Sequence, residues 1–119
     1  MQSLADRRAT VMNTGSRSGL AVLDVRGSAA MAADESLVAA LATAGERYRE
    51  VRLSVRSARL VSQTGAIVRV ESVVDTSAHV VVDESGSGTP CPAVTGSPMV
   101  FTLRWADGRW RVASVDSVS

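Results

Sequence analysis

The sequence predicts an α+β fold in which N-terminal helices pack on a curved, four-stranded antiparallel sheet. The composition changes near residue 48: alanine and leucine dominate before it, whereas valine, threonine and serine dominate after it. Apolar residues recur at steps of three and four in the first part and alternate with polar residues in the second. Helices followed by strands favour the α+β class over an alternating, parallel α/β fold.

The first part of the chain predicts three helices. The first is expected from Ser3, a residue able to cap a helix start, to about Asn13, because Gly15 then ends it. Its two arginines, Arg7 and Arg8, are expected to point away from the apolar face.

Two further helices are expected after the first. A short one is predicted over residues 19–25, ended by the "RGS" stretch that follows. The clearest one runs from Ala29 to about Ala44, where small and aliphatic residues follow one face. Ser28 is expected to cap its start, and Gly45 is expected to end it in a left-handed conformation.

The second part of the chain predicts a meander of four strands. The first begins at Val51, and the turn at 62–65 leads into a very long second strand over 66–83, expected to bend or bulge between Thr76 and Ala78. A Gly/Pro-rich loop is predicted over 84–98. The last two strands flank an Asp-Gly hairpin turn at 107–108.

Length and composition exclude several classes of protein. The 119 residues suffice for one domain over 1–119, and the formal net charge of +1 gives no strong attraction to nucleic acid or to a membrane surface. Aromatic residues make up 3%, too few for a base-stacking surface. Cys91 is the only cysteine, so no internal disulfide forms, and we expect an exposed thiol on the loop.

Four stretches, "LADRRATVM", "GERYREVRLSVRSARLV", "VVDTSAHVVVD" and "FTLRWADGRWRVASV", resemble the NTF2-like, or cystatin-like, superfamily. Within it the chain is similar to a set of actinobacterial domains of unknown function. The resemblance implies a cone of long curved strands covered by helices. Because those domains often end membrane-anchored or secreted chains, it also implies an extracytoplasmic domain of a membrane-anchored chain. The N-terminus lacks the layout of a signal peptide, so a cytoplasmic location is the alternative.

The segment "VVDTSAHVVVD", residues 73–83, carries the only histidine, His79. Proton transfer beside a carbonyl needs a positioned base and a donor for the developing oxyanion. Asp75 and His79 are weak candidates for such a base, and a bulge before His79 would turn it inward. A structural role for His79 is the preferred interpretation. Isomerase-like members of the superfamily place an oxyanion-donating tyrosine on the first helix, whereas the only tyrosine here, Tyr48, lies at the helix-to-strand junction.

A pocket, if the cone is open, is expected to be lined by five residues. These are Tyr48, Asp75, His79, Phe101 and Trp105. No metal or other cofactor is expected, because one histidine and one cysteine give no ligand spacing.

Three functions are compatible with these observations. The leading one is a non-catalytic accessory domain for protein interaction or dimerisation within a larger, membrane-anchored chain. A homodimer would then use the outer sheet face, where arginines and acids alternate. An apolar pocket with Asp75 or His79 at its base would count against this function. The alternatives are a small enzyme similar to SnoaL and ketosteroid isomerase, and a carrier of a small apolar ligand.

Overall fold

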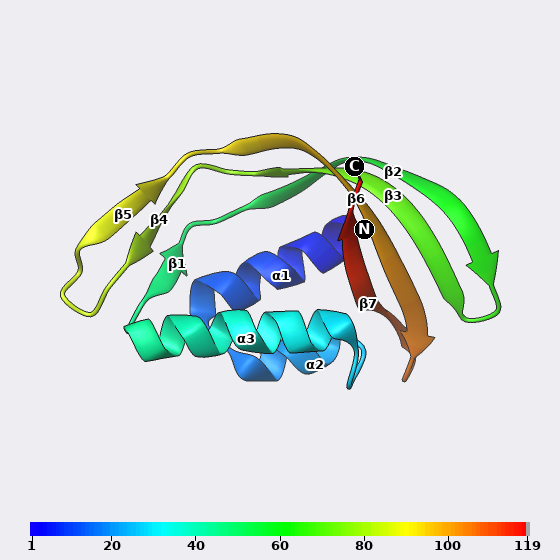
Figure 1. Cartoon of the computed structure of the whole chain (residues 1–119), viewed down its shortest axis with the longest axis horizontal. Coiled ribbons are helices and arrows are strands. Elements are labelled where there is room, and N and C mark those ends of the chain that lie inside the picture. The colour runs from blue at the N-terminus through cyan, green and yellow to red at the C-terminus, as the bar shows by residue number, and fades with distance from the viewer. Residues whose placement is uncertain (119) are drawn as a thin grey trace.

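The computed structural model describes residues 1–118, and its helices and antiparallel sheets form the predicted α+β fold. A long arch of strands covers the helices, and α1 lies between this arch and α3 (Figure 1). The helices are α1 (Gln2–Thr14), α2 (Leu20–Leu23) and α3 (Ala29–Ala44), with a 3-10 turn, η1 (Arg17–Gly19), before α2.

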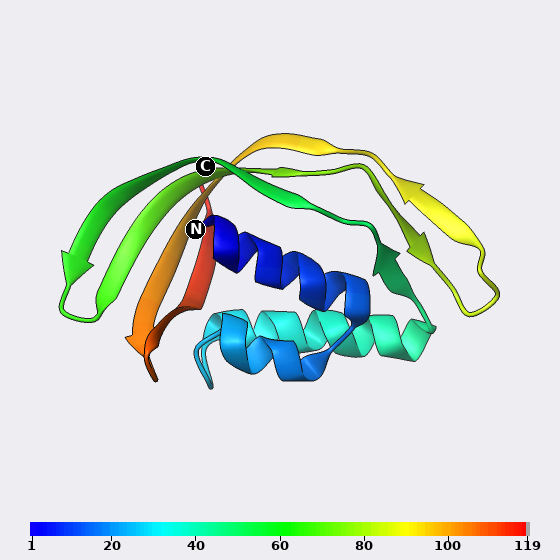
Figure 2. The same cartoon turned by 180° about the vertical axis from the view of Figure 1, so that it is seen from behind.

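The strands form two sheets, one with the order β2-β3-β6-β7 and one with the order β1-β4-β5. The three-stranded sheet extends the arch at the end opposite the β2–β3 hairpin, as Figures 1 and 2 both show. The strands are β1 (Arg47–Arg49), β2 (Leu53–Thr64), β3 (Ile67–Thr76), β4 (His79–Val82), β5 (Gly88–Cys91), β6 (Val94–Ala106) and β7 (Arg109–Ser117).

Helix α3 has the predicted bounds and the predicted caps. The Ser28 hydroxyl accepts a hydrogen bond from the Met31 backbone N–H at 3.1 Å, and Gly45 ends the helix at φ 66°. The start of α1 differs from the prediction, because Met1, without a side-chain cap, precedes the helix. Gln2 explains the earlier start: its side-chain amide binds the Leu53 carbonyl and the Val55 N–H, both at 2.9 Å, and so joins α1 to β2.

The long predicted strand is interrupted where a bend was expected. β3 ends at Thr76 and β4 begins at His79. Between them Ser77 donates its N–H to the Arg52 carbonyl and accepts from the Arg52 N–H through its hydroxyl, both at 2.9 Å. These contacts hold the chain at the point where it passes from one sheet to the other.

The loop predicted over 84–98 is wrong in extent, because strands occupy most of it. Residues 88–91 form β5, which pairs with β4, and β6 already begins at Val94, which pairs with Thr76. Long-range pairing recruits this Gly/Pro-rich stretch into strands, although its local composition favours a loop. The predicted four-stranded sheet therefore exists as β2-β3-β6-β7. β4 and β5 are inserted between β3 and β6, and together with β1, which precedes β2, they form the second, smaller sheet.

The main hydrophobic core lies between the helices and the concave face of the four-stranded sheet. Its buried residues are Leu4, Leu23, Ala30, Val68, Leu103 and Val112. Two hydrogen bonds connect α1 to the segment between β1 and β2: the Asn13 side chain donates to the Val51 carbonyl and accepts from the Val51 N–H, both at 3.0 Å. None of the helices within residues 1–118 is long and apolar enough to cross a membrane.

Candidate functional site

A cavity of about 270 Å³, here named the arch cavity, lies between α1 and the concave face of the arch. Its only polar lining residues are Arg8, Asp24 and Thr76. The other lining residues are apolar: Met1, Leu4, Ala5, Met12, Leu23, Leu53, Val74, Met99, Phe101, Val112 and Val115. A concave, mostly apolar space with a few polar groups is the usual form of a small-molecule site.

Asp24 reaches the arch cavity because the backbone on both sides of it is fixed. It directly follows α2, and its N–H donates to the Leu20 carbonyl at 2.8 Å. The next residue, Val25, donates to the Val112 carbonyl on β7, also at 2.8 Å. With both chain neighbours, Leu23 and Val25, in the core, the Asp24 residue is only 1% exposed.

A second acid, Asp34, faces Asp24 from α3, and the two are here named the buried acid pair. Asp34 is 5% exposed and shares the buried side of α3 with Ala30 and Val38. Arg8 of α1 donates through Nη1 to Asp34 Oδ1. Among the described residues, no N–H or hydroxyl group donates to either oxygen of Asp24 or to Asp34 Oδ2. The two carboxyls are hydrogen-bond partners only of each other.

The position of Asp24 changes its acidity. The pKa of Asp24 is raised from 3.8 to about 8, first by burial and then by the Asp34 carboxyl, which acts as a hydrogen-bond partner and as a negative charge. The positive charge of Arg8 acts in the opposite direction but is the smallest of these influences. At neutral pH the Asp24 carboxyl is therefore mostly protonated and uncharged.

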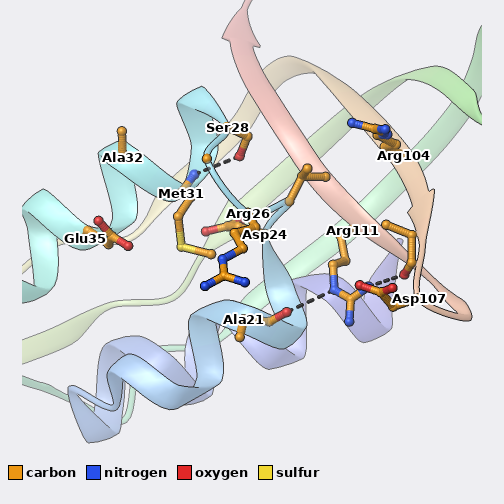
Figure 3. A pocket seen from close by; sticks show the side chains of 13 residues that line it. Ala21, Asp24, Arg26, Ser28, Met31, Ala32, Glu35, Arg104, Asp107 and Arg111 are labelled. Carbon is orange, nitrogen blue, oxygen red and sulfur yellow. Dashed lines mark hydrogen bonds and ion pairs between the residues drawn. The ribbon is translucent and has the colours of Figure 1, made fainter.

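Asp24 also lines an open groove on the other side of the α2–α3 connection. This groove, of about 810 Å³, carries three arginines, Arg26, Arg104 and Arg111. Figure 3 shows Arg111, a residue of β7, pointing toward Ala21, whose carbonyl accepts a hydrogen bond from Arg111 Nε at 2.9 Å. Asp24 thus separates an apolar cavity from an arginine-lined groove.

The five residues predicted to line one pocket do not come together. Phe101 lines the arch cavity, whereas Asp75 lies outside it and binds the Gly96 N–H at 2.8 Å and Arg56 at 3.4 Å. The ring of Trp105 packs edge-on against Trp110 with the ring centres 5.4 Å apart. The remaining two residues lie in the other sheet: Tyr48 on β1, and His79 on β4, where the break after Thr76 places it.

Tyr48 and His79 contact each other in the three-stranded sheet, with ring centres 5.3 Å apart. His79 Nδ1 lies 2.7 Å from the Ser77 carbonyl oxygen, a contact that fits the predicted structural role. His79 pairs with Cys91 across β4 and β5, so the thiol lies on a strand and not on the expected loop. Within residues 1–118, no three His, Cys, Asp or Glu side chains gather as metal ligands.

The charged residues at and behind the arch cavity, Arg8, Asp24 and Asp34, were not singled out from the sequence. Arg8 was expected to point away from the apolar face of its helix, but it turns toward Asp34. Weak signals were present: Asp24 stands between Leu23 and Val25 in an apolar run, and Asp34 lies four residues from both Ala30 and Val38.

Comparison with known proteins finds similarity in structure. The sequence matches no protein-family model and no curated protein. The intermembrane space region of chloroplast protein ARC6 is 16% identical and has a TM-score of 0.71, over 98% of this chain and 94% of that chain.

Two bacterial proteins have the same architecture. The beta subunit of a putative aromatic-ring-hydroxylating dioxygenase from Novosphingobium aromaticivorans is 15% identical with a TM-score of 0.57, over 98% of this chain and 87% of that chain. Aln2 from a Streptomyces species is 16% identical with a TM-score of 0.55, over 97% of this chain and 85% of that chain. Likeness at such identities concerns the fold and not the function. The chain has an NTF2-like fold, as the sequence resemblance implied.

Proposed function

We propose that this domain is a non-catalytic accessory module that binds a small apolar molecule in the arch cavity. One observation carries the proposal: a cavity of about 270 Å³ whose lining is apolar except for three residues. Protein interaction alone, our leading expectation from the sequence, gives this cavity no role. Asp75 and His79, the bases considered from the sequence, lie outside the arch cavity, which favours binding over chemistry by these residues.

The accessory part of the proposal is supported by the similar proteins. One of them is the beta subunit of a putative dioxygenase and another is a region of a larger chloroplast protein. By analogy, we propose that the present domain is also one part of a larger chain or assembly.

Dimerisation through the outer sheet face stays a proposal. Two pairs of the alternating charges on this face already contact each other within one chain, Arg56 with Asp75 at 3.4 Å and Arg59 with Glu71 at 3.1 Å. A dimer through this face would therefore depend little on charge attraction. Light scattering after size exclusion tests this: a dimer that is stable in both low and high salt supports it, and a monomer throughout contradicts it.

A second candidate function is an acid–base enzyme that uses Asp24. The specific observation is a carboxyl in an apolar cavity with its pKa raised to about 8, a combination typical of catalytic acids and bases. Such an enzyme would shift a proton on a small carbonyl compound. Turnover lost in Asp24→Asn, with unchanged binding of the same compound, would favour this candidate.

Binding of 4-phenylbutan-1-ol, followed by isothermal titration calorimetry, tests the proposed function. Val115 lies at the cavity and is 41% exposed, so Val115→Trp is expected to obstruct the space without disturbing the core. Val61, 45% exposed on β2 and outside the cavity lining, provides the matched control Val61→Trp. Binding that is lost in the first variant and kept in the second supports the proposal. Absence of binding to the unaltered domain, or equal binding by both variants, would overturn it.

A further inference from the structure

We propose that the ligand of the arch cavity is an organic amine, whose ammonium group binds Asp24, with Asp34 behind it, while its apolar part fills the cavity. This inference rests on the proposed function, because it names the ligand class of the same site. The proposal follows from three features. They are the buried oxygens of the acid pair, the balance of charge around them, and the different charges that line the groove and the arch cavity on the two sides of Asp24.

The first feature is the set of buried oxygens at the acid pair. Asp24 Oδ1, Asp24 Oδ2 and Asp34 Oδ2 are buried and receive no hydrogen bond from an N–H or hydroxyl group in the described part of the chain. Their one hydrogen-bonding contact is between the two carboxyls themselves, which share the proton that Asp24 keeps. Buried polar atoms usually have more partners than this. When both carboxyls are ionised the pair offers only acceptors, and an ammonium group, with up to three N–H donors, matches them.

The second feature is the charge of the cluster. Two carboxyls, Asp24 and Asp34, face a single guanidinium, that of Arg8. With both acids ionised, the cluster is one positive charge short, and an uncompensated buried charge is strongly unfavourable. In the free domain a proton on Asp24 supplies this charge, as the raised pKa of about 8 indicates. A ligand ammonium group would take the place of that proton.

The third feature is the direction of approach. The groove that Asp24 also lines carries Arg26, Arg104 and Arg111, together with two acids, Glu35 and Asp107. These arginines disfavour the entry of a cation. On the side of the arch cavity the only charged residue besides Asp24 is Arg8, and Asp34 neutralises it.

The surroundings of the acid pair also exclude a metal ion as the missing cation. The strands contribute Thr76 and otherwise only apolar side chains to the arch cavity. Residues 1–118 hold no group of three His, Cys, Asp or Glu that could bind a metal. A hard divalent cation needs six or more oxygen ligands, or keeps several waters, and an apolar wall provides neither. An amine with an apolar body can pack its apolar part against the strands and place its ammonium group at the buried acid pair.

Exchange of a proton for an ammonium group has a measurable consequence. Because the ligand requires ionised Asp24, the affinity for an amine should rise about tenfold per pH unit below pH 8 and level off above it. Binding at pH 7 should release close to one proton per ligand. A neutral ligand with the same apolar body should show neither effect.

The test compares three ligands that differ only in the head group: 4-phenylbutylamine, 4-phenylbutan-1-ol and 4-phenylbutyrate. Calorimetry from pH 6 to pH 9, in buffers of different ionisation enthalpy, gives affinity and proton release together. We expect the amine to bind at least tenfold more tightly than the alcohol at pH 8, and the carboxylate more weakly than the alcohol. Asp24→Asn should abolish the preference for the amine and keep the affinity for the alcohol. Asp116→Asn, on an exposed position outside the cavity, should leave both unchanged.

The alcohol separates failure of this inference from failure of the proposed function. If the alcohol binds and the amine binds no more tightly, the ammonium site is refuted and the apolar cavity remains. If neither binds, both proposals fall. If Asp24→Asn keeps the preference for the amine, the buried acid pair is not the recognition site. The pH series on the unaltered domain needs no variant, and an amine affinity that is constant between pH 6 and pH 8 also refutes the inference.

Discussion

Replacing Asp24 by asparagine is expected to stabilise the free domain at neutral pH. The pKa of Asp24 is raised from 3.8 to about 8, mainly by burial and then by Asp34. Between these two values the unfolded chain has released a proton that the native domain still holds. The stability contributed by the protonated carboxyl is therefore fully present below pH 3.8, declines as the pH rises, and is lost at about pH 8.

The size of the change in unfolding free energy follows from the one proton that the native domain holds and the unfolded chain has released. One bound proton corresponds to about 1.4 kcal/mol of unfolding free energy per pH unit. Between pH 5 and pH 7 the contribution of Asp24 should thus fall by about 3 kcal/mol, which is a large part of the stability of a domain of this size. Asparagine does not titrate and keeps nearly the same shape. The difference in unfolding free energy between Asp24→Asn and the unaltered domain should therefore grow by the same amount over this range.

Urea denaturation followed by circular dichroism at pH 5, 6, 7 and 8 measures this difference. The matched control is Asp83→Asn. The pKa of Asp83 is lowered, chiefly by the Ser85 hydroxyl, so its contribution is already complete above pH 3.8 and is lost only in more acid solution. The control should differ from the unaltered domain by a constant amount between pH 5 and pH 8. A difference for Asp24→Asn that is equally constant would refute the reasoning.

Three further substitutions test the contacts that position the site, each by urea denaturation. Arg8→Met removes the only cation at the buried acid pair and should cost about 1–3 kcal/mol, more at pH 8 than at pH 5; an equal loss at both values would contradict the charge argument. Asn13→Ala removes both hydrogen bonds to the Val51 backbone and should cost about 2 kcal/mol, whereas a change within error would show that water replaces them. Ser28→Ala removes the cap of α3 and should cost about 1 kcal/mol; Ser28→Asn should restore most of it.

The parts of the fold that are determined by residues close together in the sequence were predictable. Helix α3 has its predicted bounds because both of its ends are set locally, by the Ser28 hydroxyl and by the left-handed Gly45. The break after Thr76 was also predicted, since a strand over residues 66–83 is too long to stay regular. The second sheet was not, because β5 exists through its pairing with β4 and not through its own composition.

The candidate site was hidden from sequence analysis for a related reason. Helix α3 is rich in alanine on several sides, so its apolar pattern does not exclude Asp34 from the buried face. Arg8 satisfies Asp34 from another helix, and Asp24 reaches the same place through the bridge to Val112. Each residue alone is typical of a solvated surface, and only the packing of α1, α2 and β7 brings them together.

The fold itself does not require a carboxyl at position 24. Only backbone atoms of this residue hold the end of α2, and the backbone of Val25 forms the hydrogen bond to β7. An apolar side chain of similar volume would fill the place without an unpartnered buried acid, and such replacements are often neutral or stabilising. Because the carboxyl of Asp24 lowers the unfolding free energy and no contact of the fold needs it, its advantage to the protein must lie in function. The proposed amine site and the acid–base enzyme each supply such an advantage, a bound ammonium group in the first and a reacting carbonyl compound in the second. The unfolding free energy of the free domain should depend on pH in the same way whether Asp24 binds an amine or acts as a catalytic acid or base. The measurement that separates these two roles is therefore the preference for 4-phenylbutylamine over 4-phenylbutan-1-ol.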